Sequence, residues 1–238
     1  MSRIRVLLAK EWRESVRNKM ILFGAILLPL FMVGAALVMV YQGRGIEVSA
    51  AQIALFNTAL MYFLILPAII PLAIAAYSII GEKEQGSLEP LLATPISDLE
   101  LFLGKALASV IPAILITWAS FGLFIGICIL LLGGLPPHVL TPPWIAAIFG
   151  LTPLLSLFSV GVTMLVSSRA SDARAAYQIS SFAVIPAIVP LIIYTSRKTL
   201  VSLWLIGLEA VVLVVAGAIV LYLAIKVFQR EQVITRWK

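Results

Sequence analysis

The residue types that most often carry out catalysis are scarce in this chain. It has one histidine, His138, and one cysteine, Cys128, among 238 residues. One histidine cannot supply a His-Glu-x-x-His zinc site, and one cysteine cannot form an internal disulfide or a cysteine-built zinc site. The sequence also has no Gly-x-Ser-x-Gly elbow and no Gly-x-x-x-x-Gly-Lys-Ser/Thr phosphate loop. We therefore expect that the chain is not an enzyme, has no catalytic residue or metal site, and binds no cofactor or nucleotide itself.

Glu209 is the one ionisable residue deep within an apolar stretch. A charge at the bilayer centre costs about 2.5–3.5 kcal/mol on insertion scales, so this residue should face protein or water. Three interpretations stay open: a substrate contact, a protonated structural residue, or an interfacial residue near the end of its span. Two proline pairs, Pro67/Pro71 and Pro186/Pro190, interrupt other apolar stretches and predict kinks beside a transport pathway. Glu209 and these four prolines form the predicted substrate path.

Segment 81–105 holds a second concentration of reactive side chains, five of the eleven acidic residues of the chain. These are Glu82, Glu84, Glu89, Asp98 and Glu100. Three leucines, at 88, 91 and 92, form a short apolar face, and Ser97 with Glu100 fits a helix capping box. The pattern predicts two short helices joined at Pro95, which together form a docking surface for a cytoplasmic partner. A solvated charged loop is the alternative.

The elements that must position these residues are membrane spans, because the chain is too apolar for a water-soluble protein. Hydrophobic residues make up 62% of it and charged residues 12%, with a mean hydropathy of +1.10; soluble domains carry about 25% charged residues. A helix crosses the hydrocarbon with about 20 apolar residues, and six stretches satisfy this length. They are residues 20–41, 53–80, 106–132, 144–167, 175–194 and 200–225. We expect residues 1–238 to form a single all-α integral membrane domain with six transmembrane helices.

Positive charge predicts the orientation of these spans. With six spans, 14 of the 17 Lys and Arg residues fall on the side that holds both termini. The positive-inside rule then places both termini and segment 81–105 in the cytoplasm. Orientation and contact with membrane lipids account for the net charge of +6, so no nucleic acid partner is expected. The prediction is a multi-pass protein of the cytoplasmic membrane.

Residues 2–19 have the pattern of an amphipathic helix. Ile4, Leu8, Trp12 and Val16 recur every four residues, while basic residues occupy the other side. Such a helix lies in the plane of the lipid headgroups, with tryptophan as an interfacial anchor. We therefore expect an interfacial helix before the first span; the alternative is that the segment is only a topology signal.

Two stretches of the sequence resemble one family of membrane proteins. In segment 81–105 an acidic-basic-acidic triplet, Glu82–Glu84, is followed by Gly-Ser-Leu-Glu at 86–89, by Leu-Leu-Ala-Thr-Pro at 91–95 and by Gly-Lys at 104–105. Near the N-terminus, Lys-Glu-Trp-Arg at 10–13 precedes the first span. Together with the length and the six spans, these patterns resemble the membrane subunits of type-2 ATP-binding-cassette (ABC) exporters. The chain lacks the large outer domain that some family members insert after the first span.

The resemblance implies a role for the segment, because in this family the loop after the second span rests in a groove of a separate ATPase. The residues that would couple to the ATPase are Glu82, Glu84, Gly86, Ser87, Leu88, Glu89, Leu91, Leu92 and Pro95. The resemblance also implies two copies of an ABC ATPase, which bind ATP and Mg, and a second permease subunit that is identical or related.

We therefore expect the permease subunit of an ATP-driven transporter, by resemblance an exporter. It would move substrate across the cytoplasmic membrane by alternating access at the interface of two permease subunits. Two alternatives stay open at this point: a gradient-driven secondary transporter or channel, and a non-transporting, ATP-coupled membrane assembly factor.

Overall fold

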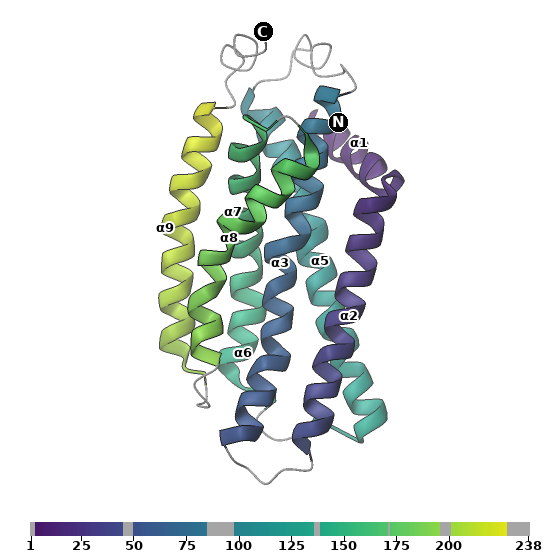
Figure 1. The fold of residues 1–238 in the computed structure, drawn as a ribbon, viewed down its shortest axis with the longest axis vertical. Coiled ribbons are helices and arrows are strands. Elements are labelled where there is room, and N and C mark those ends of the chain that lie inside the picture. The colour runs from purple at the N-terminus through teal and green to yellow at the C-terminus, as the bar shows by residue number, and fades with distance from the viewer. Residues whose placement is uncertain are drawn as a thin grey trace.

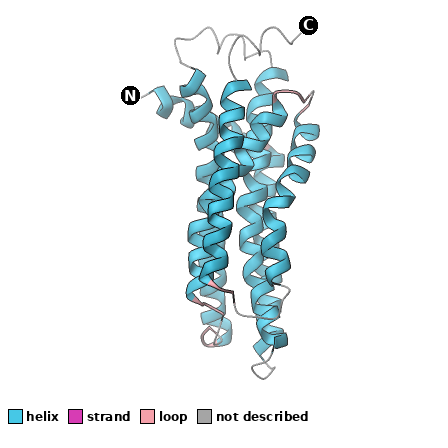
Figure 2. Cartoon of the chain, turned by 90° about the vertical axis from the view of Figure 1, so that its left-hand side faces the viewer, coloured by secondary structure: helices cyan, strands magenta, loops and turns pink. Residues whose placement is uncertain are grey.

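The structure is a computed structural model that describes residues 3–44, 50–84, 98–135, 139–170, 172–195 and 201–227. Almost all of these residues are helical and none of them is in a strand, which confirms the all-α prediction (Figure 1 and Figure 2). The helices are α1 (Arg3–Arg17), α2 (Lys19–Arg44), α3 (Ala50–Glu84), α5 (Asp98–Leu132), α6 (Pro142–Ala146), η1 (Ala147–Leu151), α7 (Thr152–Ser167), α8 (Ala173–Thr195) and α9 (Leu203–Val227). The predicted short helices around Pro95 and the loop at His138 lie outside the described residues.

Six helical stretches of the described chain are long and apolar enough to cross a membrane, in agreement with the count from sequence. They are Lys19–Arg44, Ala50–Gly81, Glu100–Leu131, Pro142–Ser167, Ala173–Ile193 and Leu203–Lys226. The fourth is composite, since α6, the π-helical stretch η1 and α7 follow one another without a break. Two prolines open α6, where their missing N–H groups cost nothing because first-turn amides have no partner within a helix. The cytoplasmic side of the bundle stays a prediction.

α3 is the central helix of the bundle. It packs against α2, α5, α7 and α8. In its most apolar 18-residue stretch, 72% of the residues are buried, compared with 22% for the corresponding stretches of α2 and α9. Aromatic rings fill the space between α3 and α5: the ring centroid of Phe63 lies 5.4 Å from that of Phe121 and 5.2 Å from that of Phe124. The buried indole N–H of Trp144 donates to Asn57 Oδ1 at 3.0 Å, so two polar groups of the core satisfy each other. α2 and α9 are therefore outer helices, and α3 connects most of the others.

α1 lies at the end of the bundle where α3 ends and α5 begins, which we call the α1 end (Figure 1). Its packed side holds Leu7 and Glu11, which are 4% and 2% exposed. Of the apolar stripe predicted from the sequence, Val16 is 64% exposed and lies off the packed side, whereas Trp12 is 40% exposed and contacts α5 in part. Attachment of α1 to the bundle is therefore observed, and its position at a membrane surface stays a prediction.

Candidate functional site: a buried ion pair at the base of segment 81–105

The residues predicted to couple to an ATPase fall at the edge of the described structure. Glu82 and Glu84 are in the last turn of α3, and the chain is described again from Asp98, where α5 begins. The other predicted coupling residues, from Gly86 to Pro95, lie outside the described residues. What the structure does describe is the base of the segment, where α3 and α5 meet α1.

A buried cluster of Glu11, Ser78 and Lys105 joins these three helices. Lys105 Nζ lies 2.9 Å from Glu11 Oε1, and the two side chains are 1% and 2% exposed. Ser78 Oγ donates to the second carboxylate oxygen, Glu11 Oε2, at 2.6 Å. Lys105 Nζ also donates to the backbone oxygen and to Oγ of Ser78, both at 3.0 Å. Both oxygens of Glu11 therefore have a charged or polar partner, as a buried charge requires.

Close packing on either side of the ion pair holds α1 against α5. A Cβ atom at Gly104 would collide with the side chain of Leu7, which would have to move, so the glycine allows α1 to approach α5 closely here. One turn further along α5, the indole N–H of Trp12 donates to the backbone oxygen of Ala108 at 3.2 Å. Leu7, Glu11 and Trp12 thus contact successive positions of α5 and fix the register of α1 on it.

The cluster brings together two motifs that are distant in the sequence. Glu11 belongs to the Lys-Glu-Trp-Arg stretch at 10–13, and Lys105 belongs to the Gly-Lys pair at 104–105. The sequence places Glu11 in the predicted interfacial helix and Lys105 at the end of segment 81–105, and it does not predict their pairing. The signal in the sequence was weak: Glu11 lies in the middle of a basic helix that also holds Glu14, and Lys105 lies just before an apolar span, so opposite charges were present but no spacing linked them.

The residues of the predicted substrate path lie on three helices, α3, α8 and α9. Pro67 and Pro71 are buried in the central helix α3, whereas Pro186 and Pro190 are exposed on α8. Glu209 is 6% exposed on α9, which packs mainly against α7, and its Oε1 atom has no hydrogen-bond partner among the described residues. The role of these five residues stays a prediction.

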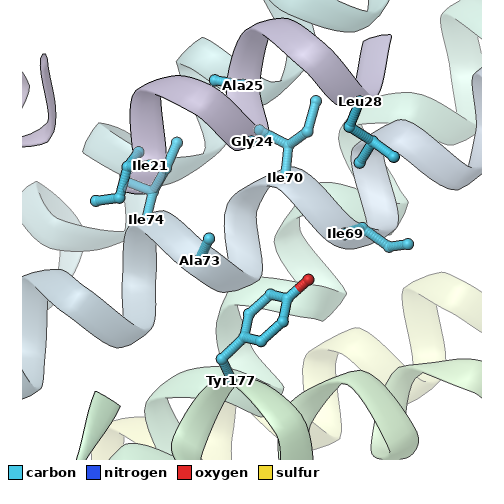
Figure 3. A pocket seen from close by; sticks show the side chains of 9 residues that line it. All are labelled: Ile21, Gly24, Ala25, Leu28, Ile69, Ile70, Ala73, Ile74 and Tyr177. Carbon is cyan, nitrogen blue, oxygen red and sulfur yellow. The ribbon is translucent and has the colours of Figure 1, made fainter. Parts of the chain in front are cut away.

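A small pocket lies between α2, α3 and α8, and none of these five residues is part of its lining. Figure 3 shows Ile21, Gly24, Ala25 and Leu28 of α2 above it, with the hydroxyl of Tyr177 directed toward α3 from the opposite side. Its volume is about 50 Å³, enough for water-sized molecules only. Among the described residues no group of three or more His, Cys, Asp or Glu side chains could hold a metal ion.

These observations define a class: an all-helical, multi-pass membrane protein with a central helix and, at one end of the bundle, the buried Glu11–Ser78–Lys105 cluster. A family model described as "ABC-2 family transporter protein" matches residues 5–202. The chain belongs to this family and is a membrane transport component of the permease type. The match includes all three members of the Glu11–Ser78–Lys105 cluster. A comparison with curated proteins found no match.

Proposed function

We propose that the chain is the permease subunit of an ATP-driven exporter. Two copies of a separate ABC ATPase bind ATP and Mg and dock on segment 81–105. Their ATP-driven movement produces alternating access at the interface of this chain with a second permease subunit. Family membership supports the transport class, and the observation that carries the coupling step is the buried Lys105–Glu11 ion pair at the base of the segment.

The cluster provides a rigid base from which the segment acts. Ser78 is six residues before the end of α3 at Glu84, and Lys105 is seven residues after the start of α5 at Asp98. At 1.5 Å per residue, the cluster is about 10 Å along each helix from the end of α3 at Glu84 and from the start of α5 at Asp98. A force on the segment therefore reaches α3 and α5 together, because Lys105 and Glu11 join them through α1. α3 then transmits the movement to the other helices that it contacts.

The docking surface combines charge with apolar contact. Glu82, Glu84 and Glu89 would pair with basic side chains of the ATPase, each exposed pair contributing about 0.2–1 kcal/mol. The leucines at 88, 91 and 92 would contribute more, because buried apolar side chains dominate most interfaces. Glu209 and the four prolines belong to the proposed substrate path.

The test is affinity purification of the tagged chain from its native membranes, followed by measurement of the ATPase activity of the purified complex. An ABC ATPase should co-purify with the wild type. The double variant Glu84→Lys/Glu89→Lys should lose most of the ATPase subunit, because lysines would repel the basic groove that the acidic residues fit. Transport should fall in parallel.

Glu47→Lys provides a matched control, since Glu47 is acidic but lies in the loop predicted on the opposite side of the membrane. Its ATPase content should equal that of the wild type. If Glu84→Lys/Glu89→Lys inserts normally and retains full ATPase content and transport, the docking role of segment 81–105 is wrong. If the wild type purifies without an ATPase and carries ion-coupled flux, the ATP-driven mechanism itself is wrong.

A further inference from the structure

A second, larger cavity lies between α1, α2 and α5, and it shares Ile21, Ala25 and Ile74 with the lining of the pocket of Figure 3. Its volume is about 360 Å³, within the range of cavities that hold small molecules. Trp12 and Val16 of α1, Leu22 and Ile26 of α2, and Pro112 and Leu115 of α5 form much of its wall. This wall is almost entirely carbon, so an apolar group fits it and a polar one does not.

Two contacts fix the position of α1 beside the cavity. The Glu11–Lys105 ion pair and the hydrogen bond from Trp12 to Ala108 fix α1 on α5. α1 therefore cannot move toward α2 to close the gap without breaking one of these bonds. An apolar cavity of this size loses the dispersion contacts of its wall unless something fills it.

The cavity opens outward, toward the surroundings of the bundle. Val16 is 64% exposed and Leu115 is 56% exposed, and both line it. Around a membrane-spanning bundle these surroundings are lipid, so the available apolar groups are acyl chains. The small pocket of Figure 3, at about 50 Å³, is too small to accept a chain.

Positive charge lies beside the opening. Arg13 is three residues before Val16, a spacing that makes the two neighbours on the surface of α1, and Arg17 is four residues after Arg13, one helical turn further along. Both arginines are exposed, as is Lys19 at the start of α2, and no ion pair joins Arg13 or Arg17 to a carboxylate in the described part of the chain. Guanidinium groups bind phosphate oxygens in a bidentate manner. An apolar slot beside two such groups matches the chemistry of one kind of molecule, an anionic phospholipid.

We propose that this site binds one anionic phospholipid, with an acyl chain in the cavity between α1, α2 and α5 and the phosphate on Arg13 and Arg17. The lipid fills the space beside α1, whose position the Glu11–Ser78–Lys105 cluster fixes, and so supports that position. The proposal depends on the membrane location of the bundle and not on coupling to an ATPase, so each can fail without the other.

Fluorescence quenching of the purified full chain tests the proposal, because bromine atoms on an acyl chain quench tryptophans that they touch. The chain is reconstituted in vesicles that contain either brominated phosphatidylglycerol or brominated phosphatidylcholine at equal mole fraction. The part of the signal due to Trp12 is obtained by comparison with Trp12→Phe. Phosphatidylglycerol should quench Trp12 at much lower mole fraction than phosphatidylcholine.

Two sets of variants separate binding of the lipid headgroup from binding of the lipid acyl chain. Arg13→Gln/Arg17→Gln should lower the preference for phosphatidylglycerol by roughly 25-fold, about fivefold for each arginine near an anionic headgroup. Ala25→Phe, which fills the cavity from α2, should reduce quenching by both lipids. Ser15→Phe fills it from α1 and serves the same purpose if Ala25→Phe does not fold.

Matched controls exist at the same end of the bundle and on another lipid-facing helix. Arg169→Gln/Arg174→Gln removes two exposed arginines at the turn between α7 and α8, and Ala183→Phe enlarges an exposed residue of α8. Neither should alter quenching of Trp12. Equal quenching by the two lipids in the wild type would overturn the proposal. An equal loss of preference in the 13/17 and 169/174 variants would also overturn it, because the effect would then be general surface charge.

Discussion

Among the residues that the structure describes, two carboxylates are buried, and their surroundings are opposite. Glu11, 2% exposed, has Lys105 Nζ 2.9 Å from one oxygen and Ser78 Oγ 2.6 Å from the other. Glu209 is 6% exposed, and its Oε1 atom has no hydrogen-bond partner among the described residues. The first lies at the α1 end, where three helices meet, and the second lies on the outer helix α9.

The difference teaches which buried charge holds the structure together. In a buried ion pair each charge compensates the other, so removal of one partner leaves an uncompensated buried charge and destabilises the fold. A carboxylate with an unsatisfied oxygen costs free energy where it stands and is kept only if something other than stability requires it. The comparison therefore assigns Glu11 a positioning role and leaves Glu209 as a candidate for contact with a substrate.

The largest effect is expected from Lys105→Met. This change keeps the length of the side chain but leaves the charge of Glu11 buried without its cation, which costs about 3–5 kcal/mol. The melting temperature of the purified protein in detergent should fall strongly. Glu11→Gln/Lys105→Met removes both charges and should recover most of the loss. Equal melting temperatures for the wild type and Lys105→Met would contradict the buried ion pair.

A smaller loss is expected from Gly104→Val, which forces Leu7 away from α5. Overpacking of this kind costs about 1–3 kcal/mol. A second change, Leu7→Ala, makes room for the valine and should raise the melting temperature of the Gly104→Val variant. Gly126→Val is the matched control, because a Cβ atom at Gly126 has no neighbour within 4 Å. If both glycine variants melt alike, the close approach of α1 is not the cause.

Trp12→Phe should have a still smaller effect on stability. The ring keeps most of its apolar surface, and the hydrogen bond to Ala108 is lost, at a cost of about 0.5–1.5 kcal/mol. Trp204→Phe on α9 changes a tryptophan that is 77% exposed and should leave the melting temperature unchanged. An identical response of the two variants would show that the indole of Trp12 does not fix α1.

The smallest effect on stability is expected from Glu209→Gln, and this variant sharpens the comparison with Glu11→Gln. A neutral amide is easier to bury than a charge that lacks a partner, so the melting temperature should stay the same or rise. Glu11→Gln, in contrast, leaves Lys105 without its counter-ion and should melt at a lower temperature. Transport by Glu209→Gln measures whether this residue contacts the substrate. A melting temperature that falls as far as in Glu11→Gln would remove the distinction between the two carboxylates.

Much of the fold could be predicted from the sequence because hydropathy is a local property. The six spans, the all-helical class and the helix before the first span follow from stretches of about 20 residues read one at a time. The resemblance to the permease family also depended on short motifs, and the match over residues 5–202 agrees with it. Hydropathy could not distinguish the central helix α3 from the outer helices α2 and α9, since all three are apolar on every side.

The sequence by itself determined which segments cross the membrane, where charge accumulates and to which family the chain belongs. Only the tertiary structure decided that Glu11 pairs with Lys105, 94 residues away, and that the side chain of Leu7 packs against Gly104. It also decided that Pro67 is buried while Pro186 is exposed. The physical reason is that an ion pair, a close contact and burial depend on which helix faces each side chain. The arrangement of helices is set by packing among segments that local patterns describe only separately.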